Sequence, residues 1–213
     1  MDQVASARTR KEALWLSCAA KFCCSYYTVY PTGADIWRIA SALQIVPWEF
    51  TEPVPAEKDA PDGFMLDATG VRFRPALQKQ PSQGPDPAPC AFLLRLEDGT
   101  ARCGLGDLRP ASCHTFPSFL INDTVCLKND GGCTCRRWTL ADVDIDEERN
   151  ALLAEARERE EYTNVVRDWN VFVQTAPQGE TFNYADFCRY LLDAYTQRAG
   201  SGAVEPVFSL AGH

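Results

Sequence analysis

The chain has 213 residues, of which 46% are hydrophobic and 23% charged, as in a soluble protein of one domain, or of one domain with an appendage. Its net charge of −8 argues against partners that present phosphate backbones or anionic membrane surfaces. It has no apolar run near the roughly 20 residues of a membrane span, and Lys21 soon interrupts the short apolar run at residues 13–16, unlike a signal peptide. We therefore expect a cytoplasmic protein that binds neither nucleic acid nor membrane.

The first sixty residues predict a mixture of helix and strand. Residues 1–24 indicate a short helix that runs into the first cysteines, and the β-branched and aromatic residues 25–30 favour a strand. Apolar residues at helical spacing predict a helix over 34–43, with Thr32 or Asp35 capping its start. The prolines and charges of residues 51–63 are typical of a loop.

The middle of the chain predicts short hairpins. Residues 64–67 and 71–74 flank a turn, and the proline-rich residues 78–89 indicate an extended connector. Asp98-Gly99 lies between two apolar runs, which is a strong hairpin signal. This hairpin places Cys90 and Cys103 at neighbouring strand ends, where they can share a ligand set.

The last part of the chain predicts one further hairpin and then helices. Residues 119–121 and 124–127 indicate paired strands, followed by a glycine-containing loop at 129–132. Charged, mostly helical sequence follows over 140–173, and a last helix over 184–198. We expect an α+β fold: a small cysteine-rich metal-binding core with short hairpins over residues 1–138, and a helical extension packed on it over residues 139–213.

Most of the ten cysteines fall into tight groups, which indicates metal binding. A disulfide framework is the alternative, but a chain of this length does not need one to form a core. The adjacent Cys23 and Cys24 are also poorly placed to bond to each other. Cys188 lies alone and is interpreted as a core thiol, and His114 is a minor ligand candidate. The candidate metal ligands are Cys18, Cys23, Cys24, Cys90, Cys103, Cys113, Cys126, Cys133 and Cys135.

Three motifs resemble those of a known family. They are Cys-x4-Cys-Cys from Cys18, Cys-x-Phe-Leu from Cys90, and Arg-Pro-x-x-Cys-x-x-Phe-Pro from Arg109. Over about residues 15–138 the chain resembles the YkgJ-like cysteine-cluster proteins, which are described as chelating zinc or iron. In the family's first motif four cysteines are usual, whereas here Lys21 stands where the second would be and the spacing is one residue shorter.

The resemblance and the thiol count together favour an iron–sulfur cluster, most simply [4Fe–4S], over zinc. The candidate thiols exceed what one tetrahedral zinc needs, and the chain lacks the Cys-x2-Cys pairs usual in structural zinc sites. Arg109 is the candidate cofactor-binding residue, because its charge favours ionised thiols nearby. Two alternatives stay open: an enzyme with a catalytic cluster, for oxidoreduction or methyl transfer, and an interaction module with structural zinc. The partner would be a protein or a small-molecule substrate.

Overall fold

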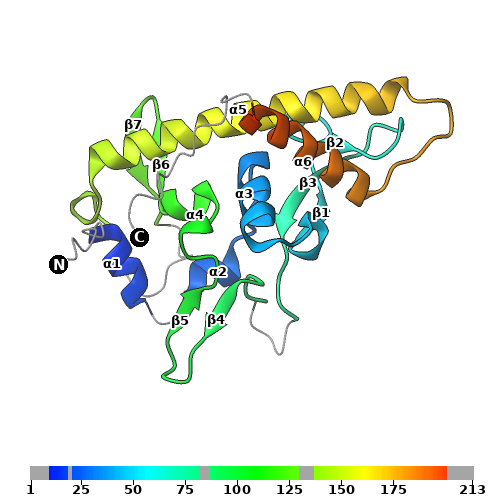
Figure 1. The fold of residues 1–213 in the computed structure, drawn as a ribbon. Helices are drawn as coiled ribbons and strands as arrows, with labels where there is room; N and C mark the ends of the chain where they lie inside the picture. Colours follow the sequence, from blue (N-terminus) through cyan, green and yellow to red (C-terminus); the bar gives the residue numbers. More distant parts are fainter. Residues whose placement is uncertain (1–9, 19–20, 82–86, 130–136, 201–213) are drawn as a thin grey trace.

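The computed structural model describes residues 10–18, 21–81, 87–129 and 137–200. These residues form an α+β fold that contains α-helices and three small antiparallel sheets. The last described elements are two helices. Figure 1 shows the longest helix, α5 (Ile145–Thr175), along one side of the molecule, with the shorter elements packed beside it. None of the helices in the described part of the chain is long and apolar enough to cross a membrane.

The first segment contains two helices where the sequence predicts one. They are α1 (Arg10–Ser17) and α2 (Phe22–Tyr26). Lys21 precedes α2 with a φ of 46°, in the left-handed region, which a continuous α-helix does not contain. The strand predicted over residues 25–30 is wrong: α2 includes its first two residues, and the remainder makes one sheet-like contact, from the amide of Leu77 to the carbonyl of Val29 at 2.9 Å.

Helix α3 (Gly33–Leu43) begins at the predicted cap. The Thr32 hydroxyl accepts a hydrogen bond from the Asp35 amide, and the Asp35 carboxylate accepts one from the Thr32 amide. This reciprocal pair satisfies donors that a helix start leaves open. A Cβ on Gly33 would lie 2.3 Å from the ring of Tyr195, so glycine permits the close approach of α3 to α6 (Tyr184–Gly200).

The largest sheet has the order β1-β3-β2. It contains β1 (Thr51–Pro55), β2 (Phe64–Met65) and β3 (Arg72–Leu77), so the hairpin predicted between the last two is confirmed. The loop predicted over 51–63 is wrong for its first five residues. The prolines of β1 are tolerated because this strand lies at the edge of the sheet and pairs only with β3.

Two separate hairpins match their predictions. One pairs β4 (Leu93–Arg95) with β5 (Ala101–Cys103), and the other pairs β6 (Ser118–Ile121) with β7 (Thr124–Leu127). Asn122 and Asp123 both have positive φ, as a two-residue hairpin turn of this type requires. Short helical turns complete the description: η1 (Pro47–Glu49), η2 (Gly106–Leu108), α4 (Ala111–Thr115) and η3 (Leu140–Asp142).

One hydrophobic core joins residues from both predicted segments. Phe64 of β2 stacks on Phe187 of α6 at 3.9 Å between ring centroids, and Trp169 of α5 meets Phe187 edge-on. Ile36 and Ile39 of α3 are fully buried in the same cluster. Cys188 is 1% exposed, in agreement with its interpretation as a core thiol.

Candidate metal centre

Five of the candidate cysteines line one cavity of about 270 Å³, which we call the thiol cavity. Two come from α2, one from the segment before β4, one from the end of β5 and one from α4. Each is a free thiol. They are Cys23, Cys24, Cys90, Cys103 and Cys113. The fold thus brings three separate sequence motifs to one place.

The first two motifs are joined directly through the backbone. The amide of Cys90 donates to the carbonyl of Cys24 at 2.8 Å. Lys79 donates its ammonium protons to the carbonyls of Cys24, Ser25 and Tyr27 at 3.1, 3.2 and 2.6 Å. These carbonyls end α2 and have no partners within the helix, so Lys79 serves as its C-terminal cap.

Two cations lie over the ring of Trp15 of α1, at the wall of the cavity. The Nζ of Lys21 is 4.6 Å from its ring centroid and the guanidinium of Arg109 is 4.3 Å away. Lys21 also donates to the carbonyls of Trp15, Leu16 and Cys18, which caps the end of α1. Lys21 therefore has a structural role at the end of α1.

Arg109 lines the thiol cavity and is 7% exposed. Its guanidinium donates to Glu12 at 2.6 Å and to the carbonyl of Gly106 at 3.1 Å. Burial raises the pKa of Cys103 and Cys113, and the positive charge of Arg109 offsets part of that rise. An arginine fixed in this way favours negative charge in the cavity.

Asp35 positions the helix that carries Cys113. Its carboxylate accepts a hydrogen bond of 3.0 Å from the amide of Ala111, the first residue of α4. The same carboxylate pairs with Arg38, which also contacts Glu158 of α5 at 2.7 Å. The start of α4 is thereby fixed to α3 and α5, two residues before the thiol.

Most thiols of the cavity are protonated in the metal-free protein. Burial raises the pKa of Cys90, Cys103 and Cys113. The hydrogen bond between Cys23 and Cys24 lowers the pKa of Cys23 to about 7 and raises the pKa of Cys24. A metal that binds here must therefore displace protons.

The other predicted ligands lie elsewhere or outside the described residues. Cys18 is disulfide-bonded, so in this form it has no thiolate to offer. Cys126 lies on β7 and is not among the residues that line the thiol cavity. Cys133 and Cys135 fall outside the described residues.

His114 follows Cys113 on α4 but does not line the thiol cavity. Burial lowers its pKa to about 4, so the imidazole is neutral at physiological pH. Its carbonyl oxygen accepts a hydrogen bond of 2.6 Å from Lys11.

The five thiols line the cavity from separate elements. Among the described residues, no group of three or more His, Cys, Asp and Glu side chains is arranged to hold a metal ion. Four thiolates around one zinc, each at about 2.3 Å, would have to lie about 3.8 Å from one another. The donor set of the thiol cavity is soft and rich in sulfur.

Two residues of the site have no signal in the sequence. Lys79 occurs within a polar, proline-rich connector, where a lysine is expected to be solvated, and Trp15 resembles an ordinary apolar helix residue. Their roles depend on contacts with residues distant in the chain. Comparison of the chain with protein-family models, with curated proteins and with solved structures finds no match.

Proposed function

We propose that this chain is a metal-binding protein that holds an iron–sulfur cluster in the thiol cavity. The main support for the proposal is that five free thiols line one cavity of about 270 Å³. The ligands would come from Cys23, Cys24, Cys90, Cys103 and Cys113, more than the four that a [4Fe–4S] cluster needs. The resemblance of the cysteine motifs to the YkgJ-like family favours the same conclusion.

The surroundings of the cavity support a negatively charged occupant. A cluster bound by thiolates carries net negative charge, and Arg109, Lys21 and Lys79 all lie next to the cysteine-bearing segments. Trp15 and Phe116 contribute aromatic surface to the wall, which limits solvent access. When bound, a cluster would supply one-electron chemistry, and its potential depends on such charges and on exposure. The five free thiols fit a reducing compartment such as the cytoplasm, whereas the disulfide bond of Cys18 does not.

Anaerobic purification of the full chain, with analysis of iron, acid-labile sulfide and zinc, tests the proposal. We expect a brown protein with stoichiometric iron and sulfide that loses its visible absorption in air. A colourless protein with stoichiometric zinc and no iron would overturn the cluster and favour the zinc alternative.

Serine substitutions identify the ligands. We expect the double variant Cys90→Ser/Cys113→Ser to lower the iron content per chain severalfold, because only three of the five cavity thiols remain, fewer than the four that the cluster needs. Cys188→Ser is the control, since that thiol is buried and does not line the cavity, and its iron content should stay at the wild-type value. Unchanged iron in the double variant would place the metal elsewhere.

A further inference from the structure

Helix α1 forms part of the wall of the thiol cavity. Its Trp15 lines the cavity, and the indole N–H donates a hydrogen bond to the sulfur of Cys23. All eight residues of α1 are described by the structure, and none of them is fully buried. In α3, by contrast, Ile36 and Ile39 are buried in the core. Hydrophobic burial therefore contributes less to the docking of α1 than to that of α3.

Charged side chains hold the first turn of α1 against the rest of the molecule. The ammonium group of Lys11 pairs with Glu148 of α5 and donates to the carbonyl of His114 of α4 at 2.6 Å. Glu12 pairs with Arg109 at 2.6 Å. Burial lowers the pKa of Lys11, which indicates that docking removes water from the ammonium group. This desolvation offsets much of the attraction within the ion pair, so the helix can undock at a small net cost in free energy.

The docking contacts lie on one face of α1. Trp15 follows Lys11 by four residues and Glu12 by three, and side chains at these spacings share a helix face. The ring of Trp15 contacts the guanidinium of Arg109, which also binds Glu12. A helix of about two turns thus carries both the ionic contacts and the residue that reaches the thiols. Loss of one ionic contact therefore loosens the whole face.

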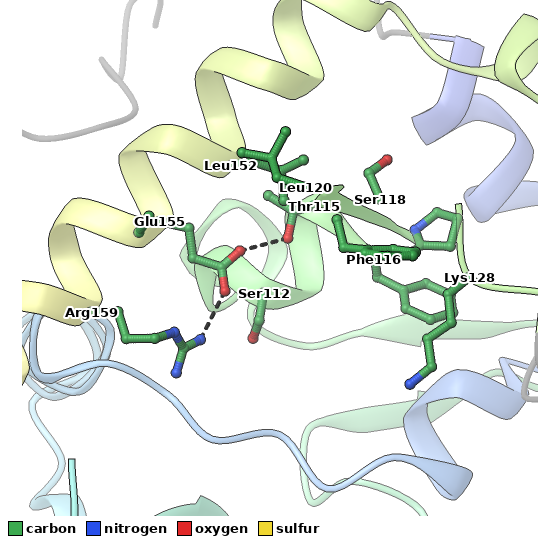
Figure 2. Close-up of a pocket in the computed structure, with 12 residues that line it drawn as sticks. Ser112, Thr115, Phe116, Ser118, Leu120, Lys128, Leu152, Glu155 and Arg159 are labelled. Carbon is green, nitrogen blue, oxygen red and sulfur yellow. Dashed lines mark hydrogen bonds and ion pairs between the residues drawn. The ribbon is translucent and has the colours of Figure 1, made fainter. Parts of the chain in front are cut away.

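The thiol-bearing helix α4 has anchors that do not involve α1. Asp35 accepts a hydrogen bond from the amide of Ala111 at 3.0 Å. Figure 2 shows the anchor at the other end of α4: the Thr115 hydroxyl donates to Glu155 of α5 at 2.8 Å, and Glu155 pairs with Arg159. Helix α2 likewise has its own anchors, in the segment before β4 and in its C-terminal cap. Undocking of α1 would leave these thiol-bearing helices in place.

We propose that α1 is a lid over the thiol cavity. In the closed form the charged side chains of Lys11 and Glu12 hold the helix against its neighbours, and Trp15 covers Cys23. In the open form α1 undocks as a unit, its charges return to water, and a metal donor or another thiol reagent reaches the cysteines. The use of this lid in loading a metal rests on the function proposed above, whereas the opening itself is a property of the metal-free fold.

Alkylation of the metal-free full chain with N-ethylmaleimide tests the lid. The chain is first reduced, so that the disulfide bond of Cys18 no longer constrains the end of α1, and mass spectrometry then reads each cysteine separately. When the lid opens and closes faster than the reagent reacts, the rate at Cys23 reports the population of the open form. Comparison of this one thiol between variants cancels its intrinsic reactivity.

Glu148→Ala should speed the alkylation of Cys23 about tenfold, because the docked helix would then bury the ammonium group of Lys11 without its carboxylate partner. Glu147→Ala is the matched control. It removes the same charge from the same turn of α5, but Glu147 is exposed, and the rate at Cys23 should stay at the wild-type value. Cys188 lies in the core and should react equally slowly in all three proteins.

Two results would overturn the lid. Equal alkylation rates of Cys23 in the variants at 147 and 148 would mean that the ion pair of Lys11 does not control access to the cavity. A faster reaction of Cys188 together with Cys23 would mean that the variant opens by unfolding of the whole chain. The assay contains no metal, so failure of this proposal and failure of the cluster assignment are separate outcomes.

Discussion

At the scale of single residues, Lys21 has the clearest structural role. It is 0% exposed and donates to three carbonyls at the end of α1. Buried lysines are rare unless their charge is bound. Here the ammonium replaces the solvent that would otherwise satisfy the last carbonyls of the helix, and it packs on the ring of Trp15. A lysine can therefore stabilise this loop without coordinating a metal.

We expect Lys21→Met to lower the free energy of unfolding by roughly 2–3 kcal/mol, because buried carbonyls lose their donor. Urea denaturation of the full chain measures this change. Lys58→Met is the control: Lys58 is exposed, and its loss should alter stability by less than about 0.5 kcal/mol. Similar stability of the two variants would show that Lys21 does not support α1.

At the scale of elements, α5 organises the molecule by completing the bonding of β2. The backbone amide of Met65 donates to the side-chain oxygen of Asn170 at 2.8 Å, and the Asn170 amide group donates to the carbonyl of Gly63 at 2.9 Å. The indole of Trp169 donates to the carbonyl of Met65 at 2.7 Å. The strand β2 has two residues. One turn of α5 thus provides the hydrogen-bond partners that a further strand would otherwise provide.

Substitution of Asn170 tests this contact. Asn170→Leu should lower the free energy of unfolding by about 2–4 kcal/mol, because two buried backbone groups of the β2 segment lose their partners. Thermal and urea unfolding measure the effect, with Asn164→Leu on the same helix as the control. If Asn170→Leu unfolds like the control, side-chain packing rather than hydrogen bonding holds β2 against α5.

At the scale of the whole molecule, the thiol cavity and the hydrophobic core meet at Leu77 and Leu105 but are built mostly from different elements. The thiol cavity is bordered by α1, α2, the β4–β5 hairpin and α4, which are short elements joined by loops. The core lies between α3, α5, α6 and β2. We expect the first group of elements to depend on a bound metal for its arrangement more than the second group does.

Hydrogen exchange on metal-loaded and metal-free protein checks this division. We expect removal of the metal to reduce protection most in α2, α4 and the β4–β5 hairpin, and least in α5 and α6, whose apolar contacts stay intact. Equal loss of protection in both groups would mean that the centre and the core unfold as one unit.

Local signals in the sequence were sufficient to predict many helices and turns of this protein. The cap at Thr32 and Asp35, the turn at Asn122-Asp123 and the helical spacing over 140–173 each depend on a few neighbouring residues, and each matches the structure. The convergence expected for Cys90 and Cys103 also came from a local hairpin signal, and both line the thiol cavity.

Only the tertiary structure decided the features that depend on contacts between distant segments. Residues 25–30 have a strand-forming composition, but no strand forms there, and Val29 makes the one hydrogen bond to β3. In contrast, β1 contains prolines and is still a strand, because it pairs on one side only. The cap that Lys79 provides for α2, the contacts of Trp15 with two cations, and the lining of the thiol cavity by five cysteines all join residues from separate elements. Composition and periodicity report local preference, and it is burial against a distant partner that overrides it.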